Sequence, residues 1–263
     1  MGLSPLLARY DNVVLDLDGC VWVGAACTRE APKAVSALRA ARKRLAFLTN
    51  SAQSSPEDYV RKLWSLGIQA SLEEVVTAGA AVQYYLSGHP PRSAYVVGSE
   101  ALVRHVADAG HRVVNGTDRA ADIVVVAGHD SFHYGELQVA ARAVLAGAEI
   151  VASDRDRGFP AEDGFRPGTG SIVAALEYAT DRRAHVVGKP DPEIFRTALD
   201  RLGDGRTLVI GDRLDADLAG AAAAGLDAAI VLTGITSAEE AYSASDPAPV
   251  AVAADLHELV VGG

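Results

Sequence analysis

The sequence lacks the features that define several large classes of protein. Its 263 residues include only two cysteines, Cys20 and Cys27, too few for a disulfide framework in a chain this long. No apolar run reaches the roughly 18 residues of a membrane span. The first residues, MGLSPLLARYDN, also lack the long apolar stretch of a signal peptide. We therefore expect a cytoplasmic protein with free thiols and no membrane partner.

Basic residues are in the minority as well. The chain has 24 Lys and Arg against 34 Asp and Glu, a formal net charge of −10. Without a basic excess it has little with which to neutralise the phosphates of a nucleic acid, so we expect no nucleic-acid partner. A small anionic ligand remains compatible, because it responds to the local field of its pocket.

Short apolar runs alternate with helical patterns along most of the chain. Runs such as VVL and LAFL suit strands that are buried on both faces of a parallel sheet. Between them, Ser55, Pro56 and the acids that follow form a typical helix start. This alternation predicts an α/β fold with a three-layer, Rossmann-like parallel sheet. The expected strands cover residues 12–17, 45–48, 94–97, 123–127, 150–152, 186–187, 208–210 and 228–232.

So many strands exceed the needs of one small sheet, and the middle third of the chain has the pattern of a second βαβ unit. We expect a smaller inserted α/β domain at residues 88–183, between core segments at 1–87 and 184–263. Residues 237–249 are rich in Ala, Ser, Asp and Pro, and we expect them to form a surface loop or flap.

Polar residues follow four of the expected strands. They are Asp16 and Asp18 in DLDG, Thr49 and Asn50 in TNS, Lys189 in GKPD, and Asp212 in GDRLDAD. Each motif alone is weak, because Asp and Gly favour ordinary turns and a lone Lys is usually solvated. Their shared place after strands is the stronger signal, since ligands of open parallel sheets bind beyond the carboxyl ends of the strands. We therefore expect these side chains to meet at one edge of the sheet.

This set of groups suits phosphoryl transfer. Crowded carboxylates repel one another unless a cation intervenes, and oxygen ligands of this kind suit Mg²⁺. Lys189 and the metal would neutralise a phosphate, while Thr49 and Asn50 would donate hydrogen bonds to it. Asp16 could attack phosphorus to give an aspartyl-phosphate. Asp18 would protonate the leaving alcohol and then deprotonate the hydrolytic water.

Together the four motifs resemble those of the haloacid dehalogenase (HAD) superfamily, and the wider sequence is similar to its NagD-like, or 4-nitrophenylphosphatase, branch. Further similar stretches lie at residues 75–86, 128–134, 188–195 and 224–234, so that the resemblance extends over residues 12–236. It implies a Mg²⁺-dependent phosphatase of small phosphorylated metabolites, with a cap domain inserted between the second and third motifs. Members of this branch often dimerise through the cap, so a homodimer is an expectation too.

The resemblance also implies a role for each acidic residue. Asp16 would be the nucleophile and Asp18 the general acid/base. Mg²⁺ would be bound by the Asp16 side chain, the Asp18 backbone carbonyl and Asp212, with Asp217 orienting metal waters or Lys189. Dehalogenases of the superfamily lack an acid at the position of Asp18, because a halide needs no proton. The sequence therefore resembles the phosphatases.

The phosphate-binding residues come from the resemblance in the same way. They would be Thr49, Asn50, Ser51 and Lys189. Ser51 stands where Asn is common in the family, a departure that would alter phosphate or cap contacts. Cys20 stands where many members have Thr; because Asp16 already serves as nucleophile, we do not expect the thiol to react.

The same residues are compatible with two other functions. A phosphotransferase or mutase could use the same aspartyl-phosphate, and a non-catalytic protein could bind a phosphate ligand on the same scaffold. A dinucleotide-dependent oxidoreductase is excluded by the lack of a GxGxxG turn after the first strand. Candidate substrates are glycerol phosphate, phosphoglycolate, nucleotide monophosphates, sugar phosphates and pyridoxal phosphate.

A few features outside the motifs have two interpretations each. His129 and His133 have the spacing of zinc ligands on a helix, but a surface role in the inserted domain is the stronger interpretation. Residues 168–171 could offer backbone amides to an anion or simply begin a helix. Residues 154–166 are the candidate specificity loop. Trp22 could line the site or pack in the core.

Overall fold

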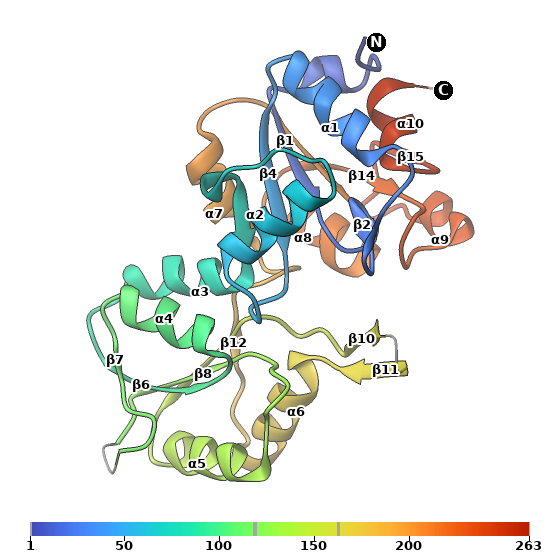
Figure 1. Cartoon of the computed structure of the whole chain (residues 1–263). Helices are drawn as coiled ribbons and strands as arrows, with labels where there is room; N and C mark the ends of the chain where they lie inside the picture. Colours follow the sequence, from blue (N-terminus) through green and yellow to red (C-terminus); the bar gives the residue numbers. More distant parts are fainter. Residues whose placement is uncertain (1, 118–119, 162–163, 263) are drawn as a thin grey trace. The chain divides into compact units, whose positions relative to one another are not determined.

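The computed structural model describes residues 2–117, 120–161 and 164–262 (Figure 1). Contacts between Cα atoms divide the chain into two compact units. The first unit comprises residues 1–49, 56–76 and 189–263, and the second comprises residues 50–55 and 77–188. The predicted insertion at residues 88–183 lies within the second unit, and its assignment as a cap domain stays a prediction.

The first unit is built on a six-stranded sheet with the order β15-β14-β13-β1-β4-β5. Strand β1 pairs in parallel with β4 and β13, and β14 pairs in parallel with β13 and β15. All five residues of β1 are buried, as expected of a central strand covered on both faces. The strands are β1 (Asn12–Asp16), β4 (Arg44–Thr49), β5 (Val75–Thr77), β13 (Thr207–Gly211), β14 (Asp227–Val231) and β15 (Ala251–Ala253).

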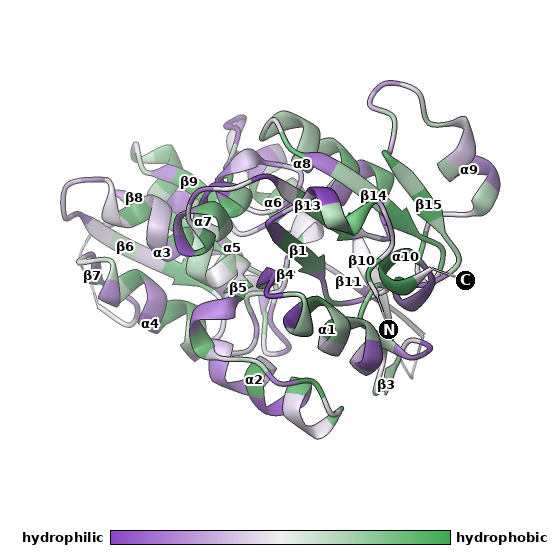
Figure 2. Ribbon diagram, turned by 90° about the horizontal axis from the view of Figure 1, so that it is seen from above, coloured by the Kyte–Doolittle hydropathy of each residue, from purple (hydrophilic) through white to green (hydrophobic). Residues whose placement is uncertain are grey.

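Helices cover both faces of this sheet, whose strands are mostly hydrophobic (Figure 2). On one face, Val13, Leu15 and Phe47 join a core with the buried side chains of α1 and α10. On the other face, α7 contacts β4 and α8 contacts β14. The α-helices described in this unit are α1 (Ala31–Ala40), α2 (Pro56–Ser65), α7 (Pro192–Leu202), α8 (Ala219–Ala223), α9 (Ala238–Ser243) and α10 (Leu256–Val261). The predicted three-layer α/β core is confirmed.

The second unit has its own parallel sheet, with the order β12-β9-β8-β6-β7. Its core joins Val124, Val126 and Ile150 of the sheet to Val144 of α5 and Val173 of α6. The strands are β6 (Ser93–Val97), β7 (Arg112–Val113), β8 (Ile123–Val126), β9 (Glu149–Ala152) and β12 (His185–Val186). The helices are α3 (Ala78–Ser87), α4 (Glu100–Asp108), α5 (Tyr134–Leu145) and α6 (Thr169–Thr180). A hairpin of β10 (Gly158–Ala161) and β11 (Gly164–Pro167) precedes α6.

The segment 237–249 differs from its prediction as a loop, because α9 begins within it. Ser237 and Glu240 form a capping box: the Glu240 N–H donates to Ser237 Oγ at 3.3 Å, and the Ser237 N–H donates to Glu240 Oε2 at 2.9 Å. Two helix-end donors are thereby satisfied, which stabilises a short helix. Among the described residues, no helix combines the length and apolar character that crossing a membrane requires.

Asp154 is a buried carboxyl group of the second unit, only 4% exposed. Ser153 Oγ donates a hydrogen bond to it at 2.7 Å, and the Asp156 N–H donates another at 2.9 Å. Burial, followed by the charge of Asp156, raises the pKa of Asp154 to about 6. The ionised form is therefore less favourable in the folded chain than in the unfolded chain.

We expect this group to make stability depend on pH. Its folded pKa is above its unfolded value, so its contribution to stability is complete below about pH 4 and is lost as the pH rises through about 6. The loss is on the order of 3 kcal/mol. The wild type loses this stability as Asp154 ionises, whereas Asp154→Asn does not. The free energy of unfolding of Asp154→Asn, relative to wild type, should therefore rise between about pH 4.5 and 7 and then level off. Urea unfolding at several pH values measures this difference, and a difference independent of pH would contradict the assignment.

Candidate active site

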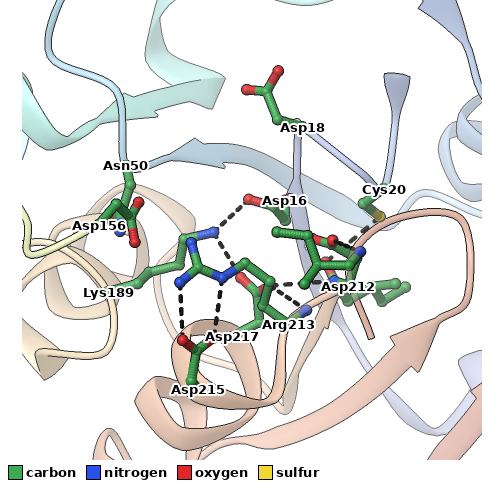
Figure 3. Close-up of polar contacts among 12 residues, drawn as sticks. Asp16, Asp18, Cys20, Asn50, Asp156, Lys189, Asp212, Arg213, Asp215 and Asp217 are labelled. Atoms are coloured by element: carbon green, nitrogen blue, oxygen red, sulfur yellow. Dashed lines mark hydrogen bonds and ion pairs between the residues drawn. The ribbon is translucent and has the colours of Figure 1, made fainter. Parts of the chain in front are cut away.

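Three buried carboxylates and one ammonium group form a cluster in the first unit (Figure 3). Asp16 ends β1, Asp212 follows β13, and Asp217 lies in the π-helix Leu214–Leu218. One oxygen from each carboxylate lies within 4.8 Å of the others. Lys189 Nζ donates to Asp217 Oδ1 at 2.6 Å and also to Asp16 Oδ1. The structure thus brings together four of the residues that the sequence placed in the site.

Asp217 holds the loop after β13 in place. Its Oδ2 accepts hydrogen bonds from the backbone N–H groups of Asp212, at 3.2 Å, and Arg213, at 3.1 Å. A Cβ atom at Gly211 would lie 2.2 Å from Asp217 Cγ, so the carboxylate packs directly on the end of the strand. The Asp217 side chain therefore bonds both the Lys189 ammonium and the backbone beside Asp212.

The carboxylate of Asp212 is closely enclosed. Its Oδ2 accepts a hydrogen bond from the Ile235 N–H at 2.7 Å. Its Oδ1 is buried and has no hydrogen-bond partner within the part of the chain that the structure describes. Cβ atoms at Gly19 and Gly234 would lie 2.5 Å and 1.8 Å from this carboxylate, so only glycine allows the backbone so close. An unpaired buried oxygen next to two other carboxylates fits a hard cation such as Mg²⁺.

The charges of the cluster shift several pKa values. Burial raises the pKa of Asp16 well above its usual value, Lys189 opposes this, and Asp217 and Asp212 add to it. Burial and the charge of Asp217 raise the pKa of Asp212 to about 6. Burial alone would lower the pKa of Lys189, but Asp16 and Asp217 outweigh it and raise that pKa, so the amine stays charged. The carboxylates therefore need a further positive charge to be fully ionised together.

Asp18 lies outside this cluster. Its side chain is exposed and points away from Asp16 and Lys189 (Figure 3). The indole N–H of Trp22 donates to Asp18 Oδ1 at 2.7 Å. Trp22 itself is fully buried, so it packs in the core, and it also donates a hydrogen bond to a predicted catalytic group.

The predicted phosphate-binding residues are divided between the two units. Thr49 is buried at the end of β4 in the first unit. Asn50 and Ser51 belong to the second unit, where Asn50 Nδ2 donates to Asp156 Oδ2 at 3.2 Å and Ser51 Oγ accepts from the Gln53 N–H at 3.3 Å. Their phosphate contacts stay a prediction. The sequence singled out the region of Asp156 but not its bond to Asn50.

Several polar residues outside the cluster have structural partners. Asp215, a further acid of the GDRLDAD motif, pairs with Arg213 at 3.0 Å. His133 Nδ1 accepts a hydrogen bond from the Gly135 N–H at the start of α5, so His133 caps this helix. His129 Nε2 lies 3.3 Å from Glu136 Oε2. Burial raises the pKa of the Cys20 thiol well above its usual value, which argues against a nucleophilic role.

Comparisons with known proteins identify the family of the chain. A sequence profile described as haloacid dehalogenase-like hydrolase matches residues 13–112, and one described as HAD-hydrolase-like matches residues 186–259. The D-glycerol 3-phosphate phosphatase of Mycobacterium tuberculosis is 39% identical over 98% of this chain and 73% of its own length.

Solved structures give the same result. A glycerol phosphate phosphatase from Mycobacterium tuberculosis, solved in complex with magnesium, superimposes with a TM-score of 0.91 and 37% identity, over 98% of this chain and 78% of that one. NagD from Escherichia coli gives a TM-score of 0.86 and 27% identity, over 94% and 97% of the two chains. The chain belongs to the haloacid dehalogenase-like hydrolases, and the resemblance to the NagD-like branch is confirmed.

The enclosure of Asp212 leads to a test of the metal site. A methyl group at Gly234 cannot be placed without displacing the Asp212 carboxylate. We expect Gly234→Ala to weaken Mg²⁺ binding by about tenfold or more, as changes around metal ligands commonly do. Calorimetric titration of the folded variants with Mg²⁺ measures this. The matched control is Gly88→Ala, where the nearest atom would lie 3.4 Å from the new Cβ; equal affinities for both variants would contradict the site.

Proposed function

We propose that the chain hydrolyses phosphate monoesters of small metabolites through an aspartyl-phosphate on Asp16. The observation that carries this proposal is the buried group of Asp16, Asp212 and Asp217 around Lys189 at the carboxyl ends of β1 and β13. Relatives named as phosphatases, one of them 39% identical, support it. Their names make glycerol 3-phosphate the first substrate to test.

The chemistry follows from the residues of the first unit. The Asp16 carboxylate attacks phosphorus, and the ester oxygen leaves as an alcohol with a proton from Asp18. Water then attacks phosphorus, Asp18 takes a proton from it, and the bond from phosphorus to Asp16 breaks. Inorganic phosphate is released, Asp16 is again a carboxylate and Asp18 is again protonated. Bound Mg²⁺, held by Asp16, Asp212 and the Asp18 backbone carbonyl, would supply positive charge for the phosphoryl oxygens.

Lys189 and Thr49 would assist the transfer from two further strand ends. The Lys189 ammonium fixes the Asp16 carboxylate through one hydrogen bond and can neutralise charge that develops on the phosphoryl oxygens. Thr49 would donate its hydroxyl to the phosphate. Asp217 holds Lys189 at 2.6 Å and so orients the ammonium without contacting substrate.

The second unit would serve as the cap that selects the substrate. Residues 88–183, predicted as an insertion, lie within it. The loop at 154–166, of which residues 162–163 lie outside the described part of the chain, is the part that we expect to contact the leaving group. Closure of such a unit excludes water during catalysis in other lidded enzymes. A cap-mediated homodimer and a cytoplasmic location remain parts of this proposal.

The role of Asp16 as the nucleophile can be tested by substitution. In the presence of Mg²⁺ the wild type should release phosphate from a panel of monoesters, and Asp16→Asn should lower kcat by more than about a thousandfold, since removal of a nucleophile commonly costs this much. A chelator should also abolish release. Asp215→Asn is the matched control, because that acid pairs with Arg213 outside the cluster. Substantial turnover by Asp16→Asn would refute the role, and no turnover by folded wild type would favour a phosphotransferase or a binding protein.

The role of Asp18 as the general acid can be tested with two leaving groups. Asp18→Asn should lower the rate of phosphoryl transfer from glycerol 3-phosphate by about a hundredfold or more, and the rate from 4-nitrophenyl phosphate much less. Nitrophenolate is a good leaving group and hardly needs a proton, whereas an alkoxide needs one. Single-turnover measurements with both esters give the two rates. Equal losses on the two substrates would argue against this role for Asp18.

A further inference from the structure

Trp22 is held rigidly beside Asp18. The indole ring is fully buried, and two residues of α2 pack on it. Tyr59 stacks with it, with ring centroids 6.4 Å apart and planes inclined by 4°. Lys62 Nζ lies 3.9 Å from the ring centroid, a cation–π contact that further restricts the ring.

The backbone between the two residues is closed by hydrogen bonds of its own. The Trp22 N–H donates to the Leu17 carbonyl at 3.0 Å, and the Gly19 N–H donates to the Trp22 carbonyl at 2.7 Å. The segment that follows β1 therefore returns on itself within a few residues. This turn brings the buried indole to the exposed carboxylate of Asp18, where the 2.7 Å hydrogen bond forms.

We propose that Trp22 is a positioning residue for Asp18, whose indole N–H fixes the direction of the carboxyl group and directs the transferable proton to Oδ2. This inference rests on the proposed function, in which Asp18 is the general acid and base. The indole nitrogen can only donate, so Oδ1 must act as an acceptor whenever the bond is made. Oδ2 is then the oxygen that carries the proton.

The direction of Asp18 suits an in-line displacement. In such a reaction the attacking and leaving oxygens lie on opposite sides of phosphorus. An acid that protonates the leaving oxygen must therefore lie apart from the nucleophile, beyond the phosphoryl group. Asp18 points away from Asp16 and Lys189 (Figure 3), and Trp22 holds it in that direction. An exposed carboxylate without such a donor would rotate among several positions.

The experiment replaces the indole N–H alone. Incorporation of 3-benzothienylalanine at Trp22 keeps the shape of the two fused rings but removes the donor. In single-turnover measurements we expect about tenfold slower phosphoryl transfer from glycerol 3-phosphate, with transfer from 4-nitrophenyl phosphate nearly unaffected and the affinity for both esters unchanged, because only protonation of the leaving oxygen is impaired. The same replacement in an Asp18→Asn background should have no further effect.

The second tryptophan of the chain provides a matched control. Trp64 is 65% exposed, and its indole N–H donates to the Ala70 carbonyl at 2.8 Å. The replacement with 3-benzothienylalanine at Trp64 should leave both esters at the wild-type rates. If the Trp22 variant also turns over both esters at wild-type rates, the inference is wrong while the proposed function stands. Absence of turnover in the wild type itself would contradict both.

A measurement without turnover keeps the inference testable if the Trp22 variant does not fold. In ¹⁵N-labelled protein each tryptophan gives one indole N–H resonance, and Trp64→Phe assigns the two. Asp18→Asn replaces the ionised acceptor by a weaker, neutral one, so it should shift the Trp22 resonance and speed its hydrogen exchange relative to wild type, while the Trp64 resonance stays in place. An unchanged Trp22 resonance would show that the hydrogen bond is absent, which overturns the inference.

Discussion

The hydrogen bonds from the Lys189 ammonium to Asp16 and Asp217 are the interactions on which the candidate site depends. All three groups are at least 95% buried, where an unpaired charge is very unfavourable. Removal of one member of such a group typically costs about 3–5 kcal/mol, because the others remain charged and buried. The ammonium therefore organises the site and is itself retained there by the two carboxylates. Asp217 extends this order to the backbone after β13 through its other oxygen.

The parallel sheet explains how residues distant in sequence come together. Strands β13 and β4 both pair in parallel with β1, so the carboxyl ends of all three strands lie at the same edge of the sheet. Asp16, Thr49 and Asp212 are each within one residue of such an end. The fold thus supplies the position, and glycine at 19 and 234 supplies the close approach of backbone to the Asp212 carboxylate. Neither feature depends on the second unit.

The central strands, the cluster residues and the family could be predicted from the sequence. Buried strands appear there as short apolar runs, and the acidic residues that follow them are recognisable as motifs. It missed features that depend on tertiary contacts. Strands β5, β7 and β15 have three residues or fewer, so the sequence contains little periodicity by which to recognise them. The bond from Trp22 to Asp18 joins residues that are close in sequence, but its formation requires the burial of the indole by Tyr59 and Lys62. The bond from Asn50 to Asp156 joins residues that no pattern connects.

The electrostatics of the cluster relate its stability to its chemistry. Three carboxylates and one ammonium leave the cluster two charges negative when all are ionised, which agrees with the raised pKa values of Asp16 and Asp212. Such an arrangement opposes folding unless a proton or a cation relieves it. A divalent cation would neutralise the cluster and leave Asp16 ionised, the form that a nucleophile requires. The unfavourable charge that the fold retains is thus the property that would bind the metal and keep the nucleophile reactive, as expected when local stability is sacrificed at a functional site.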